Sequence, residues 1–149
     1  MNSNKGGRLM NLLSLRPMSI SDYDEVLALW SNTPGLCLTS ADGPEAIAGY
    51  LERNPQLSLV CTLEGRIIGA LLAGHDGRRG FLHHLCVEPA HRRNGIARML
   101  VDSALSALKA EGIDKCHLFV LGSNEEGMDV WRALGWQQRR DIVLFSREY

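Results

Sequence analysis

Apolar side chains recur at intervals of three and four residues over residues 19–30, which predicts an amphipathic helix. Ser19 or Ser21 can cap its start, since an acidic residue follows each of them three positions later. Pro44 opens a second predicted helix, which ends before Pro55. The first third of the chain is therefore expected to contain two helices joined by a loop.

The middle of the chain instead shows the alternation that is typical of strands. In residues 57–63 apolar and polar side chains alternate, as in a strand with one buried face. Residues 66–75 and 81–87 are rich in β-forming residues and are separated by turn signals, which predicts an antiparallel meander of three strands. Residues 12–16 form a further short strand in this interpretation.

The last third predicts a long helix that starts near Ile96 and ends before Gly112, followed by an apolar strand over residues 116–121. A helix over residues 124–134 and a final hairpin over residues 136–145 complete the chain. The strands of that hairpin are residues 136–140 and 142–145. This order of elements predicts a mixed α/β layer fold.

The chain of 149 residues has the length of one domain, and no linker or repeat divides it. We expect a disordered tail over residues 1–10 and a single domain over residues 11–149. The four cysteines form no C-x-x-C pair, and no apolar run approaches the 18–20 or so residues that span a bilayer. These features predict a cytoplasmic protein with reduced thiols and no membrane partner.

Charge and composition narrow the function further. Lys and Arg total 16 and Asp and Glu total 17, which gives a net charge of −1. This balance argues against a general nucleic-acid or membrane footprint. An apolar fraction of 45% and a charged fraction of 22% are those of an ordinary globular domain.

The segment of residues 87–97 carries the clearest chemistry. It contains the end of a strand, a basic turn and the start of the long helix, where free amides and the helix dipole favour an anion. Gly95 removes a side chain where a phosphate would approach, and Arg92 and Arg93 add charged donors. The alternative is an ordinary turn with a solvated arginine pair.

This turn resembles the acyl-CoA loop of the GNAT superfamily of N-acetyltransferases. The resemblance rests on the pattern Arg92-x-x-Gly95-x-Ala97 after Val87-x-Pro89. A second signature of that family is similar to Asn124, Trp131 and the run Leu134-Gly135-Trp136. The resemblance implies an α/β fold with a mixed, mostly antiparallel sheet of about seven strands and about four helices. Such a sheet is splayed between its fourth and fifth strands, here residues 81–87 and 116–121.

The resemblance also implies roles for individual residues. Arg92 and the main-chain amides of residues 93–97 would hold the pyrophosphate of acetyl-CoA. Those five residues are Arg93, Asn94, Gly95, Ile96 and Ala97. The main chain of Leu85, Cys86 and Val87 would pair with the pantetheine arm, and the Val87 amide would polarise the thioester carbonyl. Asn124 would bind the end of the pantetheine, or it is simply a helix N-cap, and both roles are compatible.

One position departs from the family pattern. Relatives often carry a tyrosine that protonates the leaving thiolate where this chain has Trp131. An indole N–H donates a hydrogen bond but is no useful acid. Trp131 is therefore expected to pack against the pantetheine, while the thiolate takes its proton from water, Tyr50 or Tyr149.

For the base that deprotonates the amine, His83 is the first candidate, because it shares one face of an ideal strand with Leu85 and Val87. The alternatives are Glu88 and His84, which lies on the opposite face unless a bulge intervenes. Packed or surface imidazoles are the structural alternative for both histidines.

Metal and thiol chemistry find little support. No two of the histidines at positions 75, 83, 84 and 91 have the i, i+4 spacing of a helical zinc motif, so no metal is predicted. Cys86 lies close to His84 in sequence, but its strand environment favours a buried thiol over a nucleophile.

The leading hypothesis is an N-acetyltransferase that moves an acetyl group from acetyl-CoA to a primary amine by direct attack in a ternary complex. The alternatives are a non-catalytic acyl-CoA-binding module and a nucleotide-binding domain that uses the same loop. Residues 30–39 and 139–143 are expected to select the acceptor. Residues 142–145 could pair two copies in a homodimer.

Overall fold

The computed structural model describes residues 3–149, with side chains from Gly7 onward. The chain divides into two compact units, Met1–Phe119 and Val120–Tyr149, and each is described by itself below. A single domain over residues 11–149 therefore remains a prediction. Where a disordered tail was expected at residues 1–10, a helix, α1, covers Ser3–Leu12, and residues 1 and 2 lie outside the described part.

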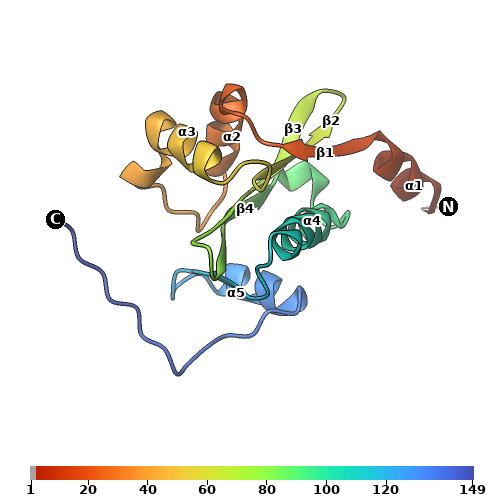
Figure 1. Cartoon of the computed structure of the whole chain (residues 1–149). Helices are drawn as coiled ribbons and strands as arrows, with labels where there is room; N and C mark the ends of the chain where they lie inside the picture. Colours follow the sequence, from red (N-terminus) through yellow and green to blue (C-terminus); the bar gives the residue numbers. More distant parts are fainter. Residues whose placement is uncertain (1–2) are drawn as a thin grey trace. The chain divides into compact units, whose positions relative to one another are not determined.

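The first unit is built on a five-stranded sheet whose strand order follows the chain, β1-β2-β3-β4-β5, and Figure 1 labels the first four of these strands. The pairs β1–β2, β2–β3 and β3–β4 are antiparallel, and β5 runs parallel to β4. The strands are β1 (Leu13–Pro17), β2 (Leu59–Leu63), β3 (Arg66–His75), β4 (Gly80–Val87) and β5 (Cys116–Leu118).

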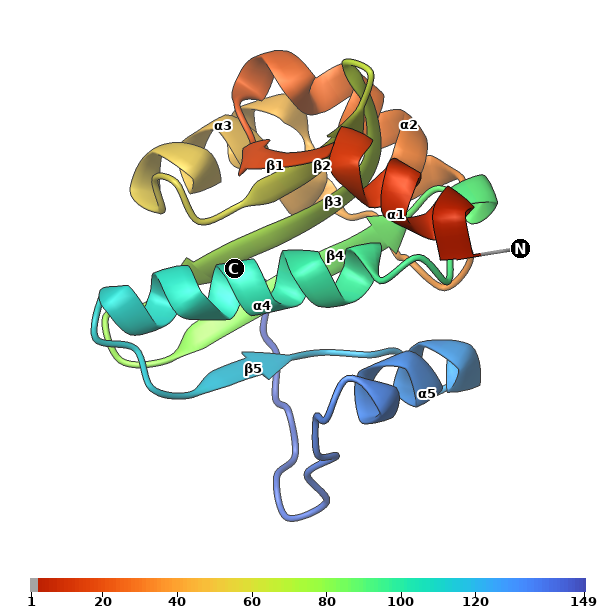
Figure 2. The same cartoon turned by 90° about the vertical axis from the view of Figure 1, so that its right-hand side faces the viewer.

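Helices cover both faces of this sheet. Figure 2 shows α4 lying across the near face, with α2 and α3 behind the strands. The helices are α2 (Tyr23–Ser31), α3 (Pro44–Arg53), α4 (Ile96–Ala110) and, in the second unit, α5 (Glu125–Ala133). Three short 3-10 turns precede α2, α3 and α4, namely η1 (Ile20–Asp22), η2 (Ser40–Asp42) and η3 (Pro89–His91).

The expectation that β2 would be buried on one face only is wrong. Leu59, Val60 and Cys61 are all buried, because α4 packs on one side of the sheet while α2 and α3 pack on the other. Gly69 on β3 allows α4 to approach closely, since a Cβ there would lie 3.2 Å from the Ile96 Cγ2 atom. This packing fixes the start of α4 against the centre of the sheet.

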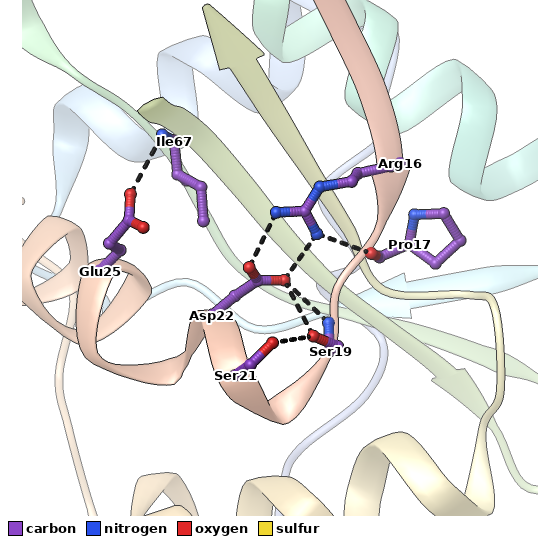
Figure 3. A network of polar contacts seen from close by, with 7 residues as sticks. All are labelled: Arg16, Pro17, Ser19, Ser21, Asp22, Glu25 and Ile67. Atoms are coloured by element: carbon purple, nitrogen blue, oxygen red, sulfur yellow. Dashed lines mark hydrogen bonds and ion pairs between the residues drawn. The ribbon is translucent and has the colours of Figure 1, made fainter. Parts of the chain in front are cut away.

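A polar network fastens the start of α2 to β1 (Figure 3). The Arg16 guanidinium donates two hydrogen bonds to the Asp22 carboxylate, at 2.7 and 2.8 Å. Asp22 Oδ2 also accepts from the Ser19 amide at 2.9 Å, as in a capping box at Ser19, which is one of the two cap positions that the sequence allowed. Hydrogen bonds from Arg16 are the main cause that lowers the pKa of Asp22.

The predicted fold class is confirmed, with a mixed sheet, four antiparallel strands and a parallel β4–β5 pair. The predicted strand count is too high. Neither strand of the final hairpin forms, since no strand pairs residues 136–140 with 142–145 among the residues described. Without a ladder of hydrogen bonds, β-forming side chains alone do not make a strand, and Phe145 is 91% exposed.

Candidate active site

A bulge in β4 shapes the candidate site. His83 lies opposite Leu72 of β3 and Cys86 lies opposite Ala70, so His84 and Leu85 together face a single residue between them. His84 adopts a positive φ of 55°, which is uncommon outside glycine. The bulge changes the alternation of side chains along the strand.

Both histidines consequently point toward the face that α2 and α3 cover. The His84 ring lies 5.0 Å from the ring of Trp30 on α2, and the His83 ring lies 6.3 Å from that of Tyr50 on α3, measured between centroids. The two imidazole centroids are 6.4 Å apart. Strand alternation alone therefore gives no reason to prefer His83 over His84.

An aspartate that the sequence reasoning missed holds one of these rings. Asp42, in the η2 turn, accepts a hydrogen bond of 2.7 Å from His84 Nε2, and its side chain is only 10% exposed. Its other oxygen accepts from the Thr39 amide at 2.9 Å. The signal was present in the sequence as a Ser/Thr-x-x-acid pattern just before Pro44, which marks a helix start.

His83 has apolar surroundings. Its ring stacks on Phe81 with centroids 6.5 Å apart and meets Tyr50 edge-on. Burial, helped by the neighbouring His84, lowers the pKa of His83 below its usual value of 6.5, against a smaller opposing effect of Asp42. His83 is therefore uncharged at neutral pH and able to accept a proton.

Two buried donors near the histidines lack a partner within the described part of the chain. They are the indole Nε1 of Trp30 and the hydroxyl of Tyr50. Burial raises the pKa of Tyr50 to about 12, so this phenol keeps its proton at neutral pH. Gly74 makes room for it, since a Cβ there would lie 2.5 Å from the Tyr50 oxygen.

The loop before α4 has the conformation of an anion site. Arg93 and Gly95 have positive φ values of 65° and 78°, and Asn94 Nδ2 donates to the His91 carbonyl at 3.0 Å. Arg92 Nε donates to the Val87 carbonyl at 3.2 Å, which draws this side chain back to the end of β4. No amide of residues 93–97 donates to another residue of the described part of the chain. These amides lie at the start of α4, a helix of 15 residues.

The β4–β5 pair opens after three residues. Gly80, Phe81 and Leu82 pair with β5, and beyond Leu82 the described chain provides no partner for that edge of β4. The Glu88 amide donates to Ile68 on β3 at 2.8 Å. Since successive amides of a strand point to opposite edges, the Val87 amide faces the open one.

Asn124 and Trp131 lie in the second unit. Asn124 is the N-cap of α5, which is one of the two roles that the sequence suggested for it. Its side-chain oxygen accepts from the Gly127 amide at 3.0 Å. Trp131 packs edge-on against Trp136, with centroids 5.2 Å apart. The roles of both residues toward the pantetheine stay predictions.

Other candidates have different partners. Glu88 accepts two hydrogen bonds from Arg66, at 3.0 and 2.9 Å, on the surface. Cys86 is buried, which raises the pKa of its thiol to about 12 and makes it a poor nucleophile at neutral pH. Among the described residues, no three His, Cys, Asp or Glu side chains gather as metal ligands would. In the same part of the chain, every helix is too short or too polar to cross a bilayer.

Comparison with known proteins shows what this chain is similar to. A model of the acetyltransferase (GNAT) family matches residues 23–136. The chain belongs to this family. An acetyltransferase of Sodalis glossinidius is 29% identical over 136 residues, which covers 91% of this chain and 94% of that protein. The resemblance seen in the loop and in the second signature is thereby confirmed, and the protein is an acetyltransferase.

Solved structures share the fold of this acetyltransferase. Ard1 from Thermoplasma volcanium superposes with a TM-score of 0.73 at 19% identity, covering 83% of this chain and 82% of that one. The PaiA N-acetyltransferase from Thermoplasma acidophilum, solved in complex with coenzyme A, gives a TM-score of 0.71 at 18% identity, covering 81% and 87%. At these identities the likeness concerns the fold.

Proposed function

We propose that this acetyltransferase moves an acetyl group from acetyl-CoA to a primary amine, which attacks the thioester directly while both substrates are bound. The observation that carries this proposal is the loop of residues 92–97, with its unbonded amides at the start of α4. Family membership and the coenzyme A in the related PaiA structure support the identity of the donor.

The loop fits a diphosphate. Five consecutive amides without an acceptor, a helix dipole and the positive charges of the adjacent Arg92 and Arg93 favour an anion at this loop. The left-handed conformation of Gly95 turns the chain there, and a Cβ at this position would meet no atom within 4 Å, so the space beside it is open.

The open edge of β4 fits the pantetheine arm. The amide groups of the pantetheine would pair with the main chain of Leu85, Cys86 and Val87 as a short additional strand. The Val87 amide, which faces this edge, would then donate a hydrogen bond to the thioester oxygen and stabilise the charge that develops there.

The reaction needs a proton acceptor for the ammonium form of the amine. The bulge brings two imidazoles to one side of β4, and His83 and His84 are the candidates in this proposal. Once neutral, the amine attacks the carbonyl carbon, the C–N bond forms and the C–S bond breaks. The second amine proton then neutralises the departing thiolate.

Calorimetric titration with acetyl-CoA tests the donor site. We expect the Arg92→Ala/Gly95→Ala double variant to bind at least about tenfold more weakly, because it loses a charged donor and distorts the loop. Gly112→Ala is the matched control. Gly112 ends α4 with φ +86° as Gly95 begins it with φ +78°, so the backbone strain is similar and only the location differs.

Release of free thiol with a panel of primary amines tests the transfer itself. A wild-type protein that gives no heat with acetyl-CoA, or a double variant that binds as the wild type does, contradicts the donor site. Tight binding without turnover on any amine contradicts the transfer and favours a module that only binds acyl-CoA.

A further inference from the structure

The Asp42–His84 pair has the arrangement of an oriented base. We propose that His84 Nδ1 is the atom that removes the proton from the acceptor ammonium, and that Asp42 is the positioning residue that prepares it. This inference rests on the proposed function, since it concerns the same transfer, and it chooses His84 over His83, which the sequence pattern alone favoured.

The hydrogen bond between the two residues determines which ring nitrogen carries the hydrogen. A carboxylate only accepts hydrogen bonds, so at 2.7 Å from Asp42 Oδ1 the Nε2 atom of His84 must carry one. In the neutral ring the lone pair is then on Nδ1. No described residue makes a hydrogen bond to this atom, and the side chain is 18% exposed, so Nδ1 is available to a substrate.

Asp42 is itself held in place from two directions. Its Oδ2 atom accepts from the Thr39 amide within the η2 turn, and its carbonyl accepts from the Tyr23 hydroxyl of α2 at 2.7 Å. These contacts join the turn before α3 to α2. The carboxylate therefore approaches β4 from a rigid support, which is what orientation of a catalytic imidazole requires.

The surroundings of His84 restrict its ring. The edge of the ring meets the buried Trp30 at an interplanar angle of 64°, and the bulge holds the backbone in a left-handed conformation. Residues other than glycine seldom adopt that region, because the Cβ atom comes too close to the neighbouring backbone. The ring of His84 is therefore held by its backbone conformation as well as by its contact with Trp30.

His83 lacks this support. Its neighbours are aromatic rings, and no hydrogen bond to its imidazole nitrogens is made by the described residues. Its lowered pKa makes it a weaker proton acceptor, which suits a wall of the acceptor site better than a base. The geometry thus distinguishes the two histidines by their partners.

The proton balance is complete with these groups. The ammonium gives one proton to Nδ1 of neutral His84, and the negative charge of Asp42 stabilises the imidazolium that forms. The amine attacks, and the proton on its nitrogen passes to the thiolate as the C–S bond breaks. His84 then releases its proton to solvent, which regenerates the neutral ring.

The first test needs no acceptor. In the uniformly ¹⁵N-labelled full chain, long-range ¹H–¹⁵N spectra should show His84 as the Nε2–H tautomer, and Asp42→Asn should abolish this preference. An Nδ1–H tautomer in the wild type overturns the inference. This result is independent of whether any amine is acetylated.

The second test compares kcat and KM with acetyl-CoA and four amines, namely butylamine, spermidine, kanamycin and alanine amide. We expect Asp42→Asn and His84→Gln to lower kcat at least about tenfold with little change in the KM for acetyl-CoA. Asp22→Asn is the matched control, since it changes the equivalent acid of the other capped turn and should keep kcat within about twofold.

His83→Gln is the decisive counterpart. A loss of kcat in this variant that exceeds the loss in His84→Gln, or a wild-type kcat in Asp42→Asn, overturns the inference and leaves the transfer intact. If the wild type acetylates none of the four amines, the proposed function is contradicted, and the tautomer still decides the role of Asp42.

Discussion

Two short turns in this protein have nearly the same local structure and contain two different kinds of carboxylate. Ser19–Asp22 and Thr39–Asp42 are both capping boxes, and each aspartate is buried, at 7% and 8% exposure. In each turn one carboxylate oxygen accepts from the amide three residues earlier, at 2.9 Å. The turns differ in what occupies the remaining oxygen.

Asp22 binds Arg16, whose charge is permanent at any physiological pH, whereas Asp42 binds His84, whose charge can change. The first pair fastens β1 to α2 and has no proton to exchange. The second pair ends at the bulge of β4. One local motif thus provides an anchor in one place and an oriented imidazole in another, and the partner alone determines which.

The largest effect is expected when Asp42 is given the kind of partner that Asp22 has. His84→Arg should preserve an ion pair with Asp42, yet lower kcat at least about 100-fold, because a guanidinium accepts no proton. Steady-state kinetics with an amine that the wild type acetylates measures this loss, and far-UV circular dichroism checks the fold. Full activity in His84→Arg would show that the reaction does not need an imidazole beside Asp42, and the two aspartates would then not differ in chemical role.

A smaller effect, on stability alone, is expected at the other turn. Asp22→Ala removes two charged hydrogen bonds and a cap, and should lower the free energy of unfolding by about 2 kcal/mol. The activity per folded molecule should not change. Urea unfolding measures the loss of stability, and an acetylation assay on the same samples measures kcat. A large loss of kcat would show that the Arg16–Asp22 pair also acts on the active site.

The smallest effect is confined to acid. The pKa of Asp22 is lowered in the folded state, so its contribution to stability is complete above the unfolded value of about 3.9 and is lost as the pH falls through the folded value. The difference in unfolding free energy between wild type and Asp22→Asn should therefore shrink between about pH 5 and pH 2. A difference that is independent of pH would exclude this origin.

The sequence was informative where the signal is local or periodic. The loop of residues 92–97, the cap at Ser19 and the order of strands and helices from β1 to β5 follow from spacing and turn chemistry. Asp42 could not be assigned in this way, because its partner lies 42 residues further along the chain and only the fold brings them together. The sequence allows a bulge in this strand, but the effect of the bulge on the two histidines depends on the register with β3.

The predicted final hairpin over residues 136–145 shows that a strong local signal can also mislead. Residues 142–145 have strong β-forming side chains, and Val143 is 75% exposed in the structure. Propensity describes how well a side chain suits a pleated surface, and a strand also needs a partner. The pattern therefore indicated what these residues favour without showing where they would pair.

The short β4–β5 ladder has a consequence for handling the enzyme. From His83 onward, one side of β4 has main-chain groups that pair with no strand of the described chain, as at the edge of a sheet. Unpaired sheet edges recruit strands from other molecules and promote aggregation. The pantetheine arm would cover this edge in the proposed function. Acetyl-CoA or coenzyme A in the buffer should therefore delay precipitation during concentration and storage.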